Sequence, residues 1–230
     1  MKKYTVLICD DNSAVHKSIT SYLTAEGINV LSAFSGEDAI NILKNSKVDV
    51  AILDIMLPGM NGLDVCREIR KINNDIYIII LSAKDEEIDR IIGLEIGADD
   101  YVCKPFSPRE ITIRIRKILK RLYEKTDVVQ SRLEYADVVV DTEAYQVYVD
   151  GRKVSFTPKE VDVLAFFIKN ESRVLSRENI LDEVWGIEYF GDTRTVDSLI
   201  KRLRRKLVQE NAKVVIRSIY GVGYKLERSE

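Results

Sequence analysis

Five side chains whose types suit phosphate chemistry follow short apolar runs in the first half of the chain. They are Asp10, Asp11, Asp54, Ser82 and Lys104. Three carboxylates held within a few ångströms of one another repel unless a cation lies among them, and an all-oxygen set suits Mg²⁺ or Mn²⁺. A carboxylate beside such an ion can attack a phosphoryl group, while a lysine and a hydroxyl bind its oxygens. The residue types therefore indicate phosphoryl transfer to an aspartate.

These side chains meet if the first half of the chain folds as a parallel sheet. Apolar runs predict strands at 4–9, 29–33, 50–53, 76–81 and 101–103. Helical patterns alternate with them at 13–26, 36–45, 62–72, 85–95 and 108–122. Most of the strands are continuously apolar, as expected when both faces are covered, so the rhythm predicts a doubly wound α/β domain with strand order 2-1-3-4-5. In that order the carboxyl ends of the strands form one crevice, which would collect the five side chains.

Two other interpretations of the acidic residues stay open at this point. The first is a solvated acidic rim beside one surface lysine. The second is a phosphohydrolase that works through an aspartyl phosphate. Such an enzyme needs the pattern D-x-D-x-T after its first strand, whereas residues 10–13 read Asp-Asp-Asn-Ser, and the second half of the chain offers no cap domain. Turnover of small phosphate esters would favour the hydrolase.

The second half of the chain has a different texture. Residues 122–132 are polar and lack periodicity, which predicts a linker between a domain at 1–121 and a domain at 133–230. Alternating strands are predicted at 136–140 and 145–149, and a hairpin at 214–219 and 224–226. Between them, a capping box at 157–160 and further helix starts after Ser176 and Thr193 predict three helices. The domain is therefore expected to be α+β.

The predicted helix 193–207 separates into two faces. Its apolar stripe consists of Val196, Leu199, Ile200, Leu203 and Leu207. The opposite side is predicted to carry Ser198, Lys201, Arg202 and Arg205. From Arg194 to Leu207 there are six Lys or Arg residues and one acid, although the net charge of the whole chain is −2. A cationic helix preceded by a second helix suits the major groove of DNA, and the alternative is a solvated charged face.

Several features bear on location and on single reactive residues. No stretch reaches the ~20 apolar residues of a membrane span, and the apolar run near the N-terminus is too short for a signal peptide, so a cytoplasmic location without membrane association is expected. Cys9, Cys66 and Cys103 form neither a disulfide framework nor a metal spacing, and Cys9 and Cys103 are expected to be buried. The only histidine, His16, is expected on the surface of the first helix.

The first 120 residues resemble the receiver domain of response regulators. The motifs that carry the resemblance are ICDDN at 8–12, LDIMLPGMNG at 53–62, LSA at 81–83 and KPF at 104–106. The resemblance implies that Asp54 accepts phosphate from a sensor histidine kinase, and that Asp10, Asp11, Asp54 and the Met56 backbone carbonyl bind Mg²⁺. It also implies a cis peptide between Lys104 and Pro105, and a switch in which Ser82 and Tyr101 respond to the phosphoryl group.

The same resemblance implies a homodimer on phosphorylation, formed by the fourth helix, the fifth strand and the fifth helix of the receiver. The residues placed on that face are Arg90, Ile91, Leu94, Asp100, Glu110 and Arg114. Within it, Arg90 with Glu110 and Asp100 with Arg114 would pair across the dimer. The alternative is that these charges are solvated helix faces, where a pair contributes only ~0–1 kcal/mol.

Residues 133–227 resemble the winged helix of the OmpR/PhoB subfamily, through DTRTVD at 192–197, LRRKL at 203–207 and YGVGY at 220–224. The resemblance implies a four-stranded N-terminal sheet, a recognition helix at 193–207 and a wing that enters the minor groove. It places Arg194, Thr195 and Arg204 on phosphates and Ser198, Lys201, Arg202 and Arg205 nearest the bases. Tyr220 stands where the wing often has arginine, and Arg217 would reach the DNA backbone.

The two resemblances together imply a transcription factor that is not an enzyme beyond its own phosphoryl transfer and autodephosphorylation. Phosphorylated dimers would bind direct-repeat promoter half-sites spaced by about one helical turn, ~10–11 bp. The loop at 186–192, with Tyr189 and Phe190, would contact RNA polymerase, or its aromatic rings would pack beneath the loop. An alternative keeps the architecture but makes DNA binding independent of phosphate.

Overall fold

The computed structural model describes residues 4–83, 93, 95–123, 131–186 and 193–229. The chain divides into two compact units, Met1–Glu124 and Lys125–Glu230. The division falls inside the predicted linker 122–132, although the last helix of the first unit continues to Tyr123 and the first strand of the second begins at Arg132. Within the described part of the chain, no helix combines the length and apolar character that a membrane span requires.

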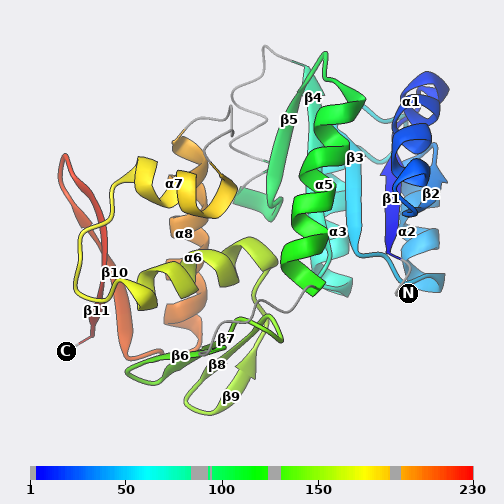
Figure 1. Cartoon of the computed structure of the whole chain (residues 1–230). Helices are drawn as coiled ribbons and strands as arrows, with labels where there is room; N and C mark the ends of the chain where they lie inside the picture. Colours follow the sequence, from blue (N-terminus) through cyan, green and yellow to red (C-terminus); the bar gives the residue numbers. More distant parts are fainter. Residues whose placement is uncertain (1–3, 84–92, 94, 124–130, 187–192, 230) are drawn as a thin grey trace. The chain divides into compact units, whose positions relative to one another are not determined.

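The first unit is a five-stranded parallel sheet flanked by helices (Figure 1). Its strands are β1 Thr5–Cys9, β2 Asn29–Ala33, β3 Val50–Asp54, β4 Tyr77–Ala83 and β5 Asp100–Lys104. Its helices are α1 Ser13–Ala25, α2 Gly36–Asn45, α3 Gly62–Ile72 and α5 Pro108–Tyr123. The order β2-β1-β3-β4-β5 confirms the predicted doubly wound topology. The predicted helix at 85–95 falls almost entirely outside the described residues.

Helices cover both faces of this sheet, which explains why its strands are continuously apolar. Alternate residues of β1 face opposite layers: Val6 and Ile8 pack with α1 and α5, whereas Leu7 and Cys9 pack with α2 and α3. Because both faces are buried, every position of β1 from Val6 to Cys9 has 0% exposure. The polar residues that follow the strands are thereby left at one edge of the sheet.

The second unit is a four-stranded antiparallel sheet, three helices and a hairpin. The strands of the sheet are β6 Arg132–Tyr135, β7 Val138–Asp141, β8 Gln146–Val149 and β9 Arg152–Val154. The helices are α6 Pro158–Lys169, α7 Arg177–Trp185 and α8 Arg194–Gln209. The strand predicted at 136–140 is present as β7, which begins two residues later, and the four-stranded sheet that the resemblance implies is confirmed. The alternating pattern missed β6, which a turn with Ala136 at φ 55° separates from β7. A positive φ is unusual for alanine, and only Asp137, the second residue of the turn, is of a type common in turns.

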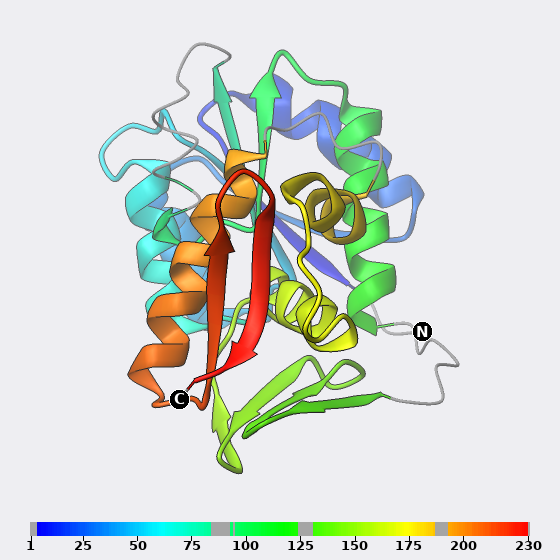
Figure 2. The ribbon, with the colours of Figure 1, turned by 90° about the vertical axis from the view of Figure 1, so that its left-hand side faces the viewer.

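The wing is the hairpin of β10 Val214–Ile219 and β11 Gly223–Arg228, and Figure 2 shows it beside α8. Leu175, which precedes α7, adds a short bridge to β11 through reciprocal backbone hydrogen bonds with Tyr224 of 2.8 and 2.9 Å. A Cβ at Gly223 would lie 2.0 Å from the Leu175 carbonyl oxygen, so this position requires glycine. The wing is therefore anchored to the entry of α7 and not only to α8.

Candidate functional site

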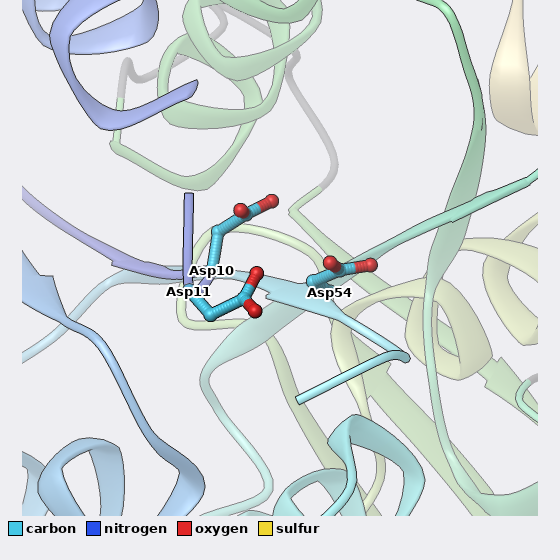
Figure 3. A group of neighbouring side chains, drawn as sticks. All are labelled: Asp10, Asp11 and Asp54. Carbon is cyan, nitrogen blue, oxygen red and sulfur yellow. The ribbon is translucent and has the colours of Figure 1, made fainter. Parts of the chain in front are cut away.

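Three carboxylates meet at the carboxyl ends of β1 and β3. Ligand atoms of Asp10, Asp11 and Asp54 all lie within 4.8 Å of one another. Figure 3 shows Asp10 and Asp11 leaving the end of one strand and Asp54 the end of the next. Asp10 and Asp54 are buried, whereas Asp11 is exposed. An all-oxygen set with one solvent-exposed member suits a hard divalent cation that keeps some of its water.

Lys104 at the end of β5 bridges the two buried carboxylates. Its Nζ lies 2.8 Å from Asp54 Oδ2 and 2.9 Å from Asp10 Oδ2. The peptide between Lys104 and Pro105 is cis, as predicted. Residues from three strands of the sheet are thus joined in one cluster, although up to 94 positions separate them in the sequence.

The environment of Asp54 makes its carboxyl a weaker acid than usual. Burial raises the pKa of the Asp54 carboxyl and the nearby Asp10 charge adds to this, while Lys104 and a hydrogen bond from the Met56 backbone oppose it without cancelling it. Burial alone would lower the pKa of Lys104, but Asp54 and Asp10 raise it above its usual value, so the amine stays charged. Burial and the same two carboxylates raise the pKa of Cys9 to about 12, so its thiol stays neutral.

The loops after the strands hold the carboxylates through short-range hydrogen bonds. Asp10 Oδ1 accepts from the Asn12 backbone N–H at 2.9 Å, and the Asn12 side chain in turn caps α1. Asn61 caps α3 in the same way, so α3 begins directly beside the end of β3. A Cβ at Gly62 would lie 1.9 Å from the Asp54 carbonyl oxygen. The glycine at position 62 is therefore what lets α3 begin so close to the end of β3.

The cationic helix of the second unit presents only some of its predicted residues. Arg194, Lys201 and Arg205 are exposed, whereas Thr195, Ser198 and Arg202 are buried. At the tip of the wing, Tyr220 is 101% exposed. Arg217 on β10 lies 2.7 Å from Glu227 on β11, and Lys225 lies 2.9 Å from the same carboxylate.

Two family models match the chain. A model of the response regulator receiver domain matches residues 6–116, and a model of the transcriptional regulatory protein C-terminal domain matches residues 151–226. The chain belongs to the response regulators. With both domains on one chain, it is a two-component response regulator with an OmpR/PhoB-type DNA-binding domain. Membership implies a histidine kinase as partner, DNA as ligand and no enzymatic activity beyond receiver phosphotransfer.

Solved structures agree with this assignment. The regulator is 29% identical to DrrB, an OmpR/PhoB homologue from Thermotoga maritima, over 100% of both chains with a TM-score of 0.52. A mutant of RitR is 25% identical over 98% of this chain and 100% of its own, with a TM-score of 0.74. A CheY-like receiver domain protein from Methanospirillum hungatei JF-1 is 27% identical over 52% of this chain and 95% of its own, with a TM-score of 0.50.

The predicted switch residues of the regulator are both buried. Ser82 at the end of β4 is 2% exposed, and Tyr101 on β5 is 7% exposed, with its ring in the apolar layer that also contains α2 and α3 residues. The ring thus already occupies an inward position in this structure. The response of Ser82 and Tyr101 to phosphate stays a prediction.

The predicted dimer face is described only in part. Arg90, Ile91 and Leu94 lie outside the described residues. Within the chain, Arg114 lies 2.8 Å from Glu110 and 3.3 Å from Asp100. The pairing of Asp100 with Arg114 that the resemblance places across a dimer therefore exists inside one subunit here, and dimerisation would have to exchange it. Tyr189 and Phe190 also lie outside the described residues.

Two predictions about single residues in the receiver were wrong. Cys103 is exposed, because its position near the end of the edge strand β5 leaves its side chain uncovered. His16 is not on the helix surface: it is 5% exposed, its Nε2 lies 2.8 Å from the Asp10 carbonyl oxygen, and its ring stacks on Phe34. Short-range periodicity showed neither the uncovered sheet edge nor the Phe34 ring.

Arg202 departs from its predicted place on the same face as Lys201 and Arg205. Its Nε lies 3.6 Å from a carboxylate oxygen of Glu160 on α6, which also binds Lys206 at 2.6 Å. Glu160 was recognised in the sequence only as the last residue of the capping box, and it does accept the Thr157 backbone N–H. The i, i+4 spacing of two cations, Arg202 and Lys206, was the available signal for an acidic partner.

A second network that the sequence did not reveal links α7, α8 and the wing. Asp197 Oδ1 accepts from Arg177 at 2.7 Å and from the Tyr224 hydroxyl at 2.5 Å. Burial and the hydrogen bond to Asp197 raise the pKa of Tyr224, so the phenol keeps the proton it donates. Arg204 donates to the Ile216 carbonyl and to Ser218 on β10. The recognition helix and the wing are thereby tied into one unit.

Proposed function

We propose that a sensor histidine kinase phosphorylates this regulator on Asp54, and that the modified protein dimerises and binds direct-repeat promoter DNA. One observation carries the proposal. Asp54 is a buried carboxylate inside a cluster of acids, with the Lys104 amine 2.8 Å from its Oδ2. A structural carboxylate has no need of two further acids beside it, since like charges raise its energy.

The chemistry of the pocket supports nucleophilic attack by Asp54. A carboxylate oxygen of Asp54 forms a bond to phosphorus, and the bond between phosphorus and the donor histidine nitrogen breaks with its electron pair going to the imidazole. We propose that Lys104 binds one oxygen of the transferred group and that the Ser82 hydroxyl donates a hydrogen bond to another. Asp10 keeps Lys104 charged and directed into the pocket.

The donor set supports a divalent cation. We assign the ligands as Asp10, Asp11 and Asp54, whose oxygens lie within 4.8 Å of one another, with the Met56 backbone carbonyl as a fourth. A Mg²⁺ or Mn²⁺ ion held by these residues would neutralise charge on the phosphoryl oxygens. Without a cation, repulsion from Asp10 contributes to the raised pKa of Asp54.

The signal is proposed to leave the pocket through Ser82 and Tyr101 and to reach the face formed by residues 85–95, β5 and α5. Residues proposed for this face are Arg90, Ile91, Leu94, Asp100, Glu110 and Arg114. Phosphate has three strong acceptor oxygens, so it draws nearby hydroxyl groups and shifts a two-state surface. Pairing of two receivers raises the effective concentration of two DNA-binding domains at adjacent half-sites.

On DNA, we propose that α8 occupies the major groove and the hairpin β10–β11 lies at the adjacent minor groove. Arg194, Thr195 and Arg204 are assigned to phosphates, Ser198, Lys201, Arg202 and Arg205 to the bases, and Arg217 and Tyr220 to the wing contact. The exposure of Lys201, Arg205 and Tyr220 supports these roles. Arg202 would have to leave Glu160 to reach a base edge.

The test compares the wild type with Asp54→Asn and with Asp75→Asn, a control at an exposed position. Each protein is treated with acetyl phosphate and Mg²⁺, digested and analysed by mass spectrometry, and its dimerisation and DNA affinity are measured. We expect a modification at Asp54 in the wild type and the control, with tighter dimerisation and DNA binding, and none in Asp54→Asn. Modification at another residue, or DNA binding that ignores phosphate, contradicts the proposal.

A further inference from the structure

The imidazole of His16 is a buried polar group for which phosphoryl transfer assigns no role. It lies in the first turn and a half of α1, is 5% exposed, and has its Nε2 2.8 Å from the Asp10 carbonyl oxygen. Its Nδ1 has no hydrogen-bond partner among the residues that the structure describes. The Asp10 carbonyl is thus the polar anchor of the ring.

The Asp10 carbonyl lies beyond the paired part of the sheet. The last residue pairs of β1 join Cys9 to Ala33 and Cys9 to Leu53, and the Asp10 backbone N–H still reaches the Ala33 carbonyl at 3.3 Å. After that point the ladder supplies no donor, and His16 donates instead. A carbonyl oxygen only accepts hydrogen bonds, so the proton of this contact is on Nε2.

This hydrogen bond acts on the peptide between Asp10 and Asp11. A peptide unit is planar, so fixing its oxygen fixes the direction in which the chain leaves for the next residue. The Asp10 carboxylate is already held by Lys104 and by the Asn12 N–H. Asp11 is exposed, and its place within 4.8 Å of the other two acids depends on the backbone that carries it.

Phe34 holds the His16 ring in place. The two ring centroids are 4.4 Å apart, and Phe34 directly follows β2, so the stack fastens α1 to the sheet beside the pocket. Phe34 is 48% exposed, so its ring lies between the imidazole and the solvent. An aromatic cover keeps water from competing for the Asp10 carbonyl.

We propose that His16 is a positioning residue of the phosphoacceptor pocket. Its Nε2–H sets the peptide between Asp10 and Asp11, and this brings the Asp11 carboxylate into reach of the divalent cation that Asp10 and Asp54 bind. The inference rests on the proposed function for the identity of the cation. Outer groups that orient metal ligands typically change metal affinity by about 10- to 100-fold when they are removed.

The test measures Mg²⁺ binding by isothermal titration calorimetry on the full chain, without a phosphodonor. His16→Leu removes the donor and keeps an apolar side chain, whereas His16→Gln keeps an N–H the same number of bonds from the backbone. We expect the Mg²⁺ dissociation constant to rise about tenfold in His16→Leu, the lower end for such groups, and to return close to the wild-type value in His16→Gln. The amide signal of Asp11 in Mg²⁺-free ¹H–¹⁵N spectra should shift in His16→Leu and recover in His16→Gln.

Ser21→Ala is the matched control. Ser21 lies on the same helix, and its hydroxyl donates to the Ser18 carbonyl at 2.9 Å, far in sequence from the acids, so its loss should leave Mg²⁺ affinity unchanged. Equal Mg²⁺ affinity in wild type and His16→Leu overturns the proposal. So does equal weakening in His16→Leu and His16→Gln, because that result assigns His16 a purely structural role.

A second pair of variants decides the question if His16→Leu does not fold. Phe34→Leu keeps an apolar cover over the imidazole and Phe34→Ala removes it, so only the alanine variant should weaken Mg²⁺ binding. Identical affinities in this pair overturn the proposal. Failure of the proposed function is a separate result: the wild type would then bind Mg²⁺ without becoming modified at Asp54 under acetyl phosphate.

Discussion

The acidic pocket of the receiver and the cationic helix α8 hold their charges in opposite ways. In the pocket, side chains from the ends of different strands converge, and Lys104 lies within 2.9 Å of both buried carboxylates. On α8, the charges diverge from one helix: Lys201 and Arg205 are exposed, while the buried Arg202 forms an ion pair, without a hydrogen bond, with a carboxylate of another helix among the described residues.

The difference shows which charges a fold fixes and which it leaves to distant partners. Parallel strands bring their carboxyl ends to one edge, so the meeting of Asp10, Asp54 and Lys104 follows from topology alone. A helix instead fixes only the direction of each side chain, and the element packed beside it decides which cation is bound and which is presented. This contrast predicts that substitutions in the two regions have opposite effects on stability.

Glu160→Gln should lower the stability of the DNA-binding domain more than any other substitution considered for α8 and its partners. Burial alone would raise the pKa of Glu160, but Arg202, Lys206 and the hydrogen bonds of the cluster lower it below its usual value. A depressed pKa means that the charged form stabilises the fold above the usual carboxyl pKa and that this is lost as the pH falls through the lower value. Removing one partner of a buried pair costs about 3 kcal/mol.

The measurement is urea unfolding at pH 7 followed by the fluorescence of Trp185, the only tryptophan of the chain. Its signal reports the DNA-binding domain because it lies at the end of α7. The control is Glu178→Gln, an exposed acid in the first turn of α7, which should change the free energy of unfolding little. Equal effects of the two variants would show that Arg202 is not held by Glu160.

Asp54→Asn should act in the opposite direction on the receiver. Because the pKa of Asp54 is raised, the folded state binds its proton more tightly than the unfolded state, and the ionised carboxylate destabilises the fold at neutral pH. The amide removes that charge, so we expect the free energy of unfolding to increase by about 1 kcal/mol, the usual size of single-site effects. The gain should shrink as the pH falls toward the usual carboxyl pKa, where wild-type Asp54 becomes protonated.

Hydrogen exchange of β1 and β3 peptides, followed by mass spectrometry at pH 7 without Mg²⁺, measures this change. Asp75→Asn, at an exposed loop position, serves as the control and should leave exchange unchanged. Faster exchange in Asp54→Asn would contradict this prediction. It would mean that the hydrogen bond from Lys104 stabilises the ionised Asp54 by more than burial of the charge destabilises it.

The receiver was predictable from sequence because its signals are local and repeated. Continuous apolar runs predicted the strands within a residue or two, and the residues that follow four of the five runs are Asp10, Asp54, Ser82 and Lys104. What could not be predicted there is the tertiary surrounding of single residues. Periodicity places His16 on a turn of α1, but its burial depends on Phe34 from another strand end.

The DNA-binding domain was less predictable for the same physical reason. Short strands separated by a turn at Ala136, with φ 55°, carry no glycine or asparagine to mark the break. Arg202 looks like Lys201 in a helical pattern, and only the long-range contact with Glu160, 42 positions earlier, separates them. The residue pattern of one helix does not predict which side chain of another element packs against it.

Lys201→Ala and Arg202→Ala form a pair that sharpens this distinction on DNA. Lys201 is assigned to the bases, and if its ammonium contacts a phosphate as well, its removal should lower the salt slope of binding by about 0.9 per protomer, since fewer counterions are released. Arg202→Ala should leave the slope unchanged if its guanidinium remains with Glu160 in the complex, and lower the stability of the domain instead. DNA affinity measured from 50 to 200 mM salt decides between these roles. An equal loss of salt slope in both variants would show that Arg202 contacts DNA in the complex.

Tyr220 is expected to have the smallest effect, because its contact carries no charge. Both wing cations near it, Arg217 and Lys225, lie against Glu227, so the fully exposed ring is what the hairpin tip offers to DNA. A neutral side chain releases no counterion, and Tyr220→Ala should therefore weaken binding by about threefold, a fraction of a strong contact, without changing the salt slope. Tyr220→Arg should steepen the slope by about 0.9 per protomer and favour sites with a narrow minor groove, whose potential attracts arginine. If the wing does not contact DNA, neither variant should change the affinity or the salt slope. Salt titrations of the wild type, Tyr220→Ala and Tyr220→Arg therefore distinguish an uncharged contact from no contact.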